Sequence, residues 1–351
     1  MTTSIVSITR RYDANLCDLN GKTVLVTGGT GSFGKAFVET VVGRFQPEKL
    51  IIFSRDELKQ FEMARRFSDR KYPFLRYFIG DVRDAERLEM AMRGVDYVVH
   101  AAALKQVPVA EYNPFECIRT NVHGAENVVR AAIRCGVKRV IGLSTDKAAN
   151  PINLYGASKL ASDKIFVAAN ALAGRNGTRF AVVRYGNVVG SRGSVVEVFE
   201  QLIKEGAAGL PITDKRMTRF LITLQQGVNV VLSSLAGMEG GELFVPKIPS
   251  VNIVDLAEAM LPAGKHQVIG VRPGEKLHEV MISEDDSRTA LELEDRYVIE
   301  PQFDFWSRTA YEKRGAKRVA EGFRYASNSN EEWLSVPEIR NLLTALRKGK
   351  A

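Results

Sequence analysis

Short apolar, β-branched runs alternate with longer amphipathic stretches over the first half of this chain. The apolar runs have the length of strands buried on both faces, and helices are expected from Lys35 to Val42, from Pro114 to Arg134 and from Tyr155 to about Ala173. Such alternation predicts an α/β fold with a Rossmann-type, doubly wound parallel sheet. The predicted strands are Lys22–Thr27, Leu50–Phe53, Leu75–Ile79, Tyr97–His100, Val140–Leu143 and Phe180–Tyr185.

The alternation loosens after the last of these strands, where loop-like basic segments become frequent. This change predicts a smaller C-terminal substrate-binding lobe. Residues 305–351 are expected to form a helical tail that includes an amphipathic helix over Val336–Leu346. The expected division is an N-terminal arm over residues 1–18, a Rossmann domain over residues 19–189 and about 223–260, and the substrate-binding lobe over residues 190–222 and about 261–351.

A glycine-rich loop follows the first predicted strand and opens the next helix. Gly29, Gly31 and Gly34 have the G-x-G-x-x-G spacing, and Gly28 adds the alternative G-x-x-G-x-x-G. Bare backbone lets a pyrophosphate approach the helix N-terminus and its N–H groups. The loop therefore predicts dinucleotide binding, with contacts from Gly28, Thr30, Gly31, Ser32, Phe33 and Gly34.

The end of the second predicted strand bears on which dinucleotide binds. An acidic residue there would bind the ribose hydroxyls of NAD, whereas an Arg would bind the 2′-phosphate of NADP. Ser54 and Arg55 come first and favour NADP, while Asp56 and Glu57 either blur this choice or start the next helix. Asp81, after the third strand, can hydrogen-bond an adenine amine or cap a helix. Further cofactor contacts are expected at Ser54, Arg55, Lys59, Asp81, Val82, Ala101, Ala102, Ala103, Lys105, Tyr155 and Lys159.

The candidate chemistry is concentrated after the fifth predicted strand. Tyr155 and Lys159 are four residues apart on a helix, so that the Lys159 ammonium can favour the Tyr155 phenolate. Asp146 and Lys147, at the strand end, offer a proton donor and a proton acceptor to one substrate. A Tyr-x-x-x-Lys pair also occurs on ordinary amphipathic helices, but its place at a strand end favours a catalytic role.

A buried polar residue and several basic loops complete the predicted site. Asn121, in the predicted Pro114–Arg134 helix, is expected to brace the active site by hydrogen bonds to backbone. The basic segments that follow the catalytic stretch are typical of a lobe that clamps an anionic substrate. Substrate contacts are expected at Lys105, Asn187, Ser191, Arg192, Arg219, Lys247, Arg272 and Glu275.

Composition narrows the function classes. The 351 residues include 49 Lys plus Arg against 41 Asp plus Glu, a net charge of +8, but no basic run with interleaved aromatics. We therefore expect an anionic small molecule rather than nucleic acid as the partner. Cys17, Cys117 and Cys135 lie far apart and the four histidines are scattered, so neither disulfides nor a metal site is expected. Without a signal peptide or a spanning segment, we expect a cytoplasmic protein with no membrane partner.

Together these features resemble the extended short-chain dehydrogenase/reductase family, and more closely its inverting UDP-N-acetylglucosamine 4,6-dehydratases of the pseudaminic-acid pathway. The retaining sugar dehydratases carry Asp-Glu at the position of Asp146 and Lys147, and large membrane-bound relatives carry Met at Tyr155. Gln106 departs from the His frequent in the family and bears on the preference among UDP-sugars. The resemblance covers nearly the whole chain from residue 19, in the motifs TGGTGSFGK (27–35), SRDELKQ (54–60), GDVRD (80–84), HAAALK (100–105), STDKAANPINLYGASK (144–159), RYGNVVGSRGSV (184–195), MTRF (217–220), FVPKIPS (244–250) and RPGEKLHE (272–279).

The resemblance implies a mechanism on UDP-N-acetylglucosamine. Tyr155 takes the proton of the 4-hydroxyl, which Thr145 holds, while carbon 4 gives a hydride to NADP⁺. Lys147 then removes the proton of carbon 5 while Asp146 protonates the departing 6-hydroxyl, which requires a lowered pKa for Lys147, promoted by a second cation such as Lys159, and a protonated Asp146. The hydride returns to carbon 6, and reprotonation on the opposite face inverts carbon 5. The product is UDP-2-acetamido-2,6-dideoxy-β-L-arabino-hex-4-ulose, and the recycled NADP is expected to remain tightly bound.

Two rival functions remain open. A UDP-HexNAc 4-epimerase would share Tyr155 and Lys159 but would not need the elimination pair Asp146 and Lys147. A non-catalytic NADP-sensing protein would not need the Tyr-Lys pair either. The resemblance also implies a homo-oligomer, from dimer to hexamer, formed through the Pro114 helix and the helix that bears Tyr155.

Overall fold

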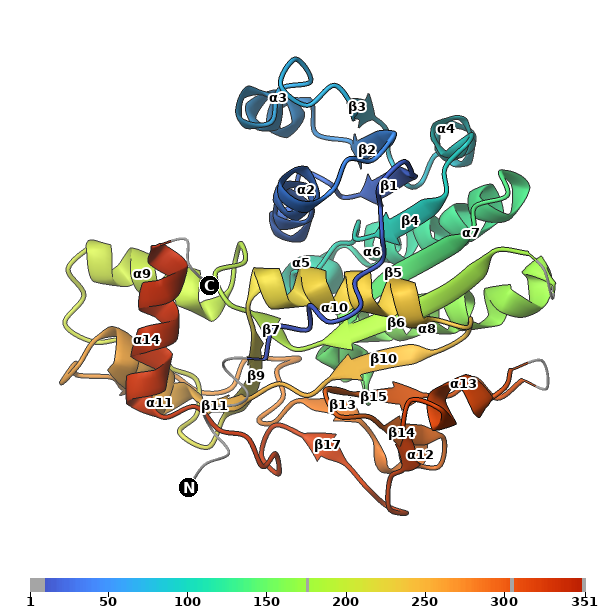
Figure 1. Ribbon diagram of the computed structural model, residues 1–351. Coiled ribbons are helices and arrows are strands. Elements are labelled where there is room, and N and C mark those ends of the chain that lie inside the picture. The colour runs from blue at the N-terminus through green and yellow to red at the C-terminus, as the bar shows by residue number, and fades with distance from the viewer. Residues whose placement is uncertain (1–9, 175–176, 304–305, 349–351) are drawn as a thin grey trace.

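The computed structural model describes residues 10–174, 177–303 and 306–348, and a ten-stranded sheet forms their centre (Figure 1). Its order is β16-β14-β15-β10-β6-β5-β4-β1-β2-β3. The neighbours from β10 to β3 pair in parallel, which confirms the doubly wound α/β fold. The parallel strands are β1 (Thr23–Thr27), β2 (Lys49–Ser54), β3 (Leu75–Ile79), β4 (Tyr97–His100), β5 (Arg139–Thr145), β6 (Arg179–Tyr185) and β10 (Leu243–Pro246).

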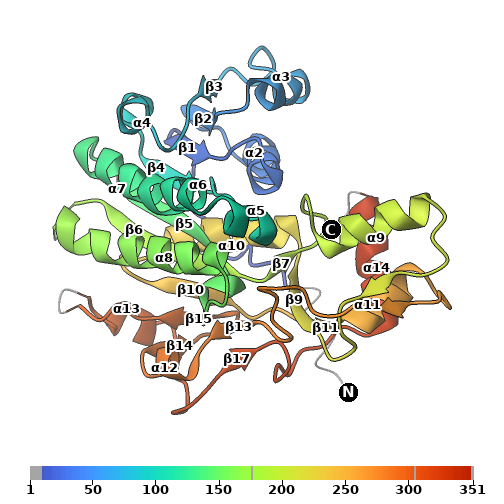
Figure 2. The ribbon, with the colours of Figure 1, turned by 180° about the vertical axis from the view of Figure 1, so that it is seen from behind.

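Helices cover both faces of this sheet. Helices α2 and α10 pack against each other on one face, whereas α4, α7 and α8 lie on the other, as the two opposite views show (Figures 1 and 2). Burial on both faces explains why β1 consists of five buried residues without polar alternation. The helices flanking the sheet are α2 (Ser32–Arg44), α3 (Glu57–Arg66), α4 (Ala85–Met92), α5 (Val107–Tyr112), α6 (Pro114–Ile118), α7 (Gly124–Arg134), α8 (Leu154–Ala173) and α10 (Leu224–Gly237).

The predicted helix from Pro114 to Arg134 is interrupted. A π-helical turn, η1 (Arg119–His123), separates α6 from α7. The buried Asn121 in this turn donates from Nδ2 to the Leu104 carbonyl (2.9 Å), and its Oδ1 accepts from the Leu104 N–H (2.8 Å). The expectation that Asn121 braces the site through backbone is confirmed, and the π turn is the local distortion that holds it there.

The C-terminal part differs from the expected division. Residues 290–299 and 317–318 were assigned to the substrate-binding lobe, yet they extend the central sheet through antiparallel pairing with β10. The helical tail predicted from residue 305 also contains two strands. Antiparallel strands cover the edge that β10 would otherwise expose, a constraint that acts between distant segments. The elements are β13 (Val280–Ile282), α12 (Glu284–Ser287), β14 (Ala290–Glu292), β15 (Arg296–Ile299), α13 (Thr309–Glu312), β16 (Lys317–Arg318) and β17 (Tyr325–Ala326).

A second lobe with its own hydrophobic core lies beside the carboxyl ends of the parallel strands (Figure 1). Phe199, Leu256 and Ile339 are buried in this core, and the amphipathic segment expected at Val336–Leu346 forms its outer helix. The lobe and its connections contain β7 (Asn187–Val188), α9 (Val195–Lys204), β8 (Pro211–Ile212), β9 (Thr218–Ile222), β11 (Ser250–Asn252), α11 (Ile253–Met260), β12 (Gln267–Val268) and α14 (Val336–Arg347).

The described part of the expected N-terminal arm, residues 10–18, is tied to the rest of the molecule. Arg10 forms an ion pair with Glu332 (2.9 Å) and donates to the Lys247 carbonyl (2.5 Å). The buried Tyr12 donates to the same carbonyl. These contacts join the N-terminal segment to the C-terminal third of the chain, while residues 1–9 lie outside the described part.

Candidate active site

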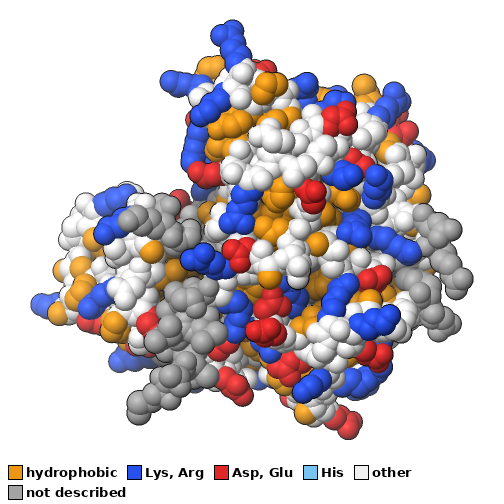
Figure 3. Space-filling model, viewed as in Figure 1, with side chains coloured by type: hydrophobic (Ala, Val, Ile, Leu, Met, Phe, Trp, Pro, Cys, Tyr) orange, Lys and Arg blue, Asp and Glu red, His pale blue; other side chains and the backbone are white. Residues whose placement is uncertain are grey.

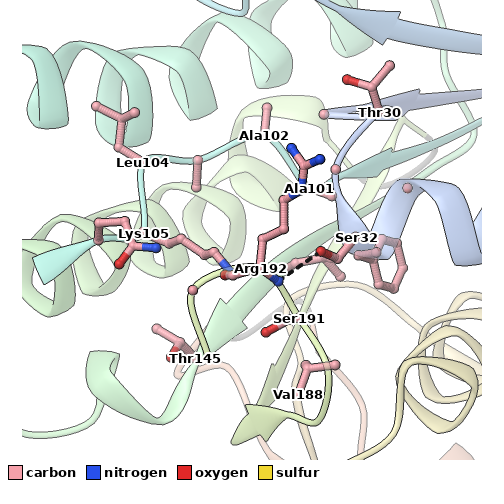
Figure 4. Close-up of a pocket in the computed structure, with 18 of the residues that line it drawn as sticks. Thr30, Ser32, Ala101, Ala102, Leu104, Lys105, Thr145, Val188, Ser191 and Arg192 are labelled. Carbon is pink, nitrogen blue, oxygen red and sulfur yellow. Dashed lines mark hydrogen bonds between the residues drawn. The ribbon is translucent and has the colours of Figure 1, made fainter. Parts of the chain in front are cut away.

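A cavity of about 630 Å³ opens at the carboxyl ends of the parallel strands, between the sheet and the second lobe (Figure 4). Ligands bind at this edge in open α/β sheets. Its wall includes all of the residues expected to contact the cofactor, namely Gly28, Thr30, Gly31, Ser32, Phe33, Gly34, Ser54, Arg55, Lys59, Asp81, Val82, Ala101, Ala102, Ala103, Lys105, Tyr155 and Lys159.

The glycine loop has the geometry that a dinucleotide requires. Gly28 has φ +63°, and a Cβ there would lie 2.9 Å from the Ala102 backbone. Gly31 is the N-cap of α2 and makes no side-chain cap, so N–H groups of the first turn are available to an anion at the cavity wall. The loop therefore fits a pyrophosphate placed against the positive end of α2.

At the end of β2, the side chains of Arg55, Asp56 and Lys59 all lie on the cavity wall. Asp56 caps α3 by accepting from the Lys59 N–H (3.0 Å), and it also accepts from Lys59 Nζ (2.5 Å). Its carboxylate is thus used to start the helix, one of the two alternatives that the sequence left open. Arg55 lies on the cavity wall, 3.6 Å from an oxygen of Asp81.

The loop that follows β7 lies across the cavity. Lys105 Nζ donates to the Arg192 carbonyl (2.7 Å), and the Arg192 N–H donates to Ser32 Oγ (3.3 Å), the contact dashed in Figure 4. Ser191 and Arg192 therefore lie between the glycine loop and the loop that follows β4. This arrangement brings expected cofactor contacts and expected substrate contacts to one wall.

The start of α8 positions the phenol. Asn153 caps the helix by accepting from the Gly156 N–H (2.8 Å), which places Tyr155 in the first turn, facing the cavity together with Thr145 and Lys147. Burial raises the pKa of Tyr155 to about 12, and Lys147 is the cation that opposes this rise most strongly. We expected Lys159 in that role; its own pKa is lowered by burial, with Asp163 opposing the shift.

Lys147 lies between two buried carboxylates. Its Nζ is 3.0 Å from Asp146 Oδ1 and 3.3 Å from Glu279 Oε1, and it also donates to Asn187 Oδ1 at 3.4 Å. Asp146 is fully buried behind the cavity wall and accepts a second hydrogen bond from Thr145 (2.9 Å). The pair predicted to carry out elimination is therefore part of a cluster of three charged side chains.

The charges in this cluster shift its pKa values in opposing directions. Burial alone would lower the pKa of Lys147, but Asp146 and Glu279 outweigh it and raise that pKa, contrary to the expected fall. Burial raises the pKa of Asp146, as expected of a proton donor, and the neighbouring Glu279 adds to the rise. Glu279 has a lowered pKa because Lys147 and Arg219 together outweigh its burial.

The residues expected to bind substrate separate into two groups. Lys105, Asn187, Ser191 and Arg192 line the cavity. The other four do not line it. Arg219 lies against Glu279 behind the wall, and Lys247 lies outside the wall. Arg272 is exposed and shares one turn with Glu275.

Lys247 is not among the residues that line the cavity. Its Nζ pairs with Glu292 (2.7 Å) and lies over the Tyr297 ring, so that it holds the β10 and β15 region together. Lys247 follows β10, which comes late in the chain, and nothing in the local sequence distinguishes it from the basic residues that reach the cavity.

Sequence reasoning did not single out Glu279 as a functional residue. It ends the RPGEKLHE segment directly before the apolar residues of β13. The available signal was an acidic residue next to a short buried strand. The basic residues around it, however, favoured an interpretation of this segment as an anion-binding loop.

The surface and the remaining side chains add three observations. On the face in Figure 3, Lys and Arg side chains are interspersed with Asp and Glu. Within the described ranges, no group of three or more His, Cys, Asp or Glu is placed to hold a metal ion. No helix in the same part of the chain is long and apolar enough to cross a membrane.

A Rossmann sheet with a glycine loop, and a Tyr-Lys pair on α8 facing the same cavity, define a short-chain dehydrogenase/reductase. The chain belongs to the polysaccharide biosynthesis protein family, whose sequence model matches residues 24–301.

Relatives with two different activities are similar to this chain. It is 58% identical to the UDP-N-acetylglucosamine 4,6-dehydratase (inverting) of Campylobacter jejuni, over 92% of this chain and 98% of that protein. It is 43% identical to the UDP-glucose 4-epimerase of Rickettsia canadensis, over 93% and 96%. Among solved structures it is similar to Pen from Bacillus thuringiensis, with a TM-score of 0.84 and 38% identity over 93% of this chain and 99% of that one.

Proposed function

We propose that this chain is an enzyme, a UDP-N-acetylglucosamine 4,6-dehydratase that inverts carbon 5. The observation that carries the proposal is the Lys147–Asp146 pair next to Tyr155, since a 4-epimerase needs no elimination pair. The 58% identity to the Campylobacter jejuni dehydratase supports it further. The product would be UDP-2-acetamido-2,6-dideoxy-β-L-arabino-hex-4-ulose, the first intermediate of pseudaminic-acid-type sugar synthesis.

The glycine loop and the α2 N-terminus would hold a nicotinamide dinucleotide. When bound, this cofactor accepts a hydride from carbon 4 and returns it to carbon 6. We favour NADP because Arg55 faces the cavity while the Asp56 carboxylate is used by the α3 cap and Lys59. Since the cofactor ends each turnover in the form in which it began, it would stay bound.

Side chains of the cavity wall, together with Asp146 directly behind it, would move the protons. Tyr155 takes the proton of the 4-hydroxyl, and Thr145 hydrogen-bonds that hydroxyl. The resulting 4-ketone acidifies carbon 5, and Lys147 takes the carbon 5 proton after passing its own proton to Asp146, 3.0 Å away. Asp146 gives its proton to the departing 6-hydroxyl, so that water leaves and a double bond joins carbons 5 and 6. A proton added to carbon 5 from the opposite face then inverts that centre.

The loop across the cavity would bind the nucleotide end of the substrate. Arg192 and Lys105 bring positive charge to the wall, and Ser191 and Asn187 bring hydrogen-bonding groups. A guanidinium suits the two oxygens of a phosphate. We assign UDP to this wall and the hexosamine ring to the space between Tyr155 and Lys147.

The test is incubation of the purified protein with UDP-N-acetylglucosamine in deuterated water without added cofactor, followed by proton NMR. The expected product is a 6-deoxy-4-keto sugar with deuterium at carbon 5 and inverted configuration. Retained configuration would overturn inversion and the assigned function of Lys147. UDP-N-acetylgalactosamine as product would establish the epimerase, the alternative that the Rickettsia relative supports.

Two controls accompany this test. Lys147→Ala should abolish elimination while the protein still retains its cofactor; loss of both would indicate a folding defect. The cofactor released by heating should carry a 2′-phosphate, and its absence would overturn the choice of NADP.

A further inference from the structure

Glu279 lies against the proposed catalytic lysine from a segment far away in the sequence. Its side chain is 2% exposed, and its Oε1 is 3.3 Å from Lys147 Nζ and 3.7 Å from Arg219 Nε. Its Oε2 is buried without a hydrogen-bond partner among the described residues. Burial of an incompletely satisfied carboxylate is unfavourable for folding, so its position calls for a functional reason.

The backbone around Glu279 is fixed on both sides. Its N–H donates to Ser327 Oγ (2.9 Å), and the Ser327 N–H donates to its carbonyl (2.8 Å). β13 begins at the next residue and pairs with β17, and it packs against η2 (Asp146–Ala148), the 3₁₀ turn that carries the catalytic pair. The pairing of two short strands therefore aims the Glu279 carboxylate at Lys147.

In its protonated form Lys147 has one positive charge and two carboxylates within 3.3 Å of Nζ. One carboxylate is enough to balance this charge, and Asp146 and Glu279 differ in their other neighbours. Arg219 adds positive charge near Glu279, whereas Asp146 is fully buried and bonds otherwise to the neutral Thr145. The environment therefore favours the charge on Glu279 and the proton on Asp146.

We infer that Glu279 is the counter-ion of Lys147, a positioning residue that leaves Asp146 free to carry the proton given to the departing 6-hydroxyl. The inference rests on the proposed dehydratase function. Lys147 takes the proton of carbon 5 as the free amine, and Glu279 balances the ammonium that this step forms. Without Glu279, Asp146 would become the counter-ion and lose the proton that elimination consumes.

The Glu279 charge should shift the titrations of Lys147 and Asp146 in a defined direction. Lys147 is faced by Asp146 on its own turn, by Glu279 before β13, by Arg219 on β9 and by Tyr155 on α8. Removal of the Glu279 charge lowers the pKa of both Lys147 and Asp146, since a negative neighbour favours the protonated form of each. Both titrations should therefore move to lower pH, by about one to three units.

The test compares Glu279→Gln with wild type in the full chain with its bound cofactor. The first readout is the reactivity of the Lys147 amine with an acylating reagent as a function of pH, located by peptide mass spectrometry. The second is the pH profile of elimination beside the reduction of bound cofactor on substrate addition. Glu300→Gln is the matched control, because Glu300 is 6% exposed and pairs with Arg308 in the region of β15 and α13.

In Glu279→Gln, the Lys147 titration and the elimination profile should both move to lower pH, and elimination near neutral pH should fall at least ~10-fold while cofactor reduction persists. Glu279→Asp should retain most of the wild-type titration. Unchanged titration of Lys147 in Glu279→Gln would overturn the inference, as would loss of fold or cofactor, which would assign Glu279 a structural role. If wild type instead gives an epimer, the proposed function fails, and the labelling still decides whether Glu279 sets the charge of Lys147.

Discussion

At the scale of single residues, a buried histidine lies where the paired strands β1 and β4 end. His100 is 1% exposed at the end of β4, and its Nδ1 is 2.8 Å from Thr27 Oγ1. Burial, with a smaller contribution from Lys159, lowers the pKa of His100 to about 3. The imidazole is therefore neutral in the folded protein at any pH where the enzyme would work.

This neutrality predicts a loss of stability in acid. Below the ordinary His pKa of 6.5 the unfolded chain binds a proton that the folded protein refuses, so the free energy of unfolding falls by about 1.4 kcal/mol per pH unit until pH approaches 3. His100→Asn keeps a partner for Thr27 and removes this titration. Urea unfolding between about pH 4 and about pH 7 should show wild type losing stability relative to the variant as pH falls; parallel curves would contradict the assignment.

At the scale of an element, α2 contains two glycines with opposite requirements. A Cβ at Gly34 would lie 2.3 Å from the Gly29 carbonyl oxygen, so the start of the helix can meet the glycine loop there only without a side chain. Gly43, near the end of the same helix, is exposed, and a Cβ there would contact nothing within 4 Å. Gly34 therefore permits the close approach of α2 to the glycine loop, whereas nothing packs against Gly43.

This contrast predicts opposite effects of one substitution. Gly34→Ala should destabilise the protein by about 1–3 kcal/mol and release the copurified cofactor, because the loop must move away from the helix. Gly43→Ala should stabilise it by about 0.5–1 kcal/mol through helix propensity and leave cofactor content unchanged. Thermal unfolding and the cofactor-to-protein ratio measure both effects. Equal cofactor content in the two variants would contradict the tight approach at Gly34.

At the scale of the whole molecule, helices α5, α6 and α8 lie beside one another (Figure 2), and large apolar side chains of α5 and α6 are exposed. Tyr112 is 89% exposed and Phe115 76%. Helices α6 and α8 are the ones expected from the sequence to form a subunit interface, and α5 lies beside them. Exposed apolar patches mark such surfaces. We propose that the chain forms a homo-oligomer through this face.

A charge placed on this face should separate the subunits. Phe115→Asp is expected to lower the mass measured by light scattering to that of a smaller assembly, because burial of a carboxylate at an interface is unfavourable. Val198→Asp, at a 45% exposed position on α9, is the matched control and should leave the mass unchanged. A monomeric wild type, or equal masses for the two variants, would contradict the proposed interface.

The Rossmann half of the fold could be predicted with nearly correct strand positions, because strands covered on both faces are uninterrupted apolar runs. Lys22–Thr27 was predicted and Thr23–Thr27 observed. The antiparallel strands β14 to β16 could not be predicted, since their pairing depends on a free edge at β10 that no local pattern records. The π turn at Asn121 was likewise not predicted: its side chain bonds to the Leu104 backbone, a contact that the pattern of the Pro114–Arg134 segment does not record.

The sequence by itself determined the chemistry that is local along the chain: the glycine spacing before α2, the Tyr155–Lys159 pair one turn apart, and the Asp146–Lys147 dipeptide at a strand end. The tertiary structure determines which charged side chains from distant segments lie next to these local motifs. It placed Glu279 against Lys147 and left Lys247 beside Glu292, although both come from the same C-terminal third. The physical reason is that charge interactions depend on distance in space and on burial, and neither can be read from spacing along the chain.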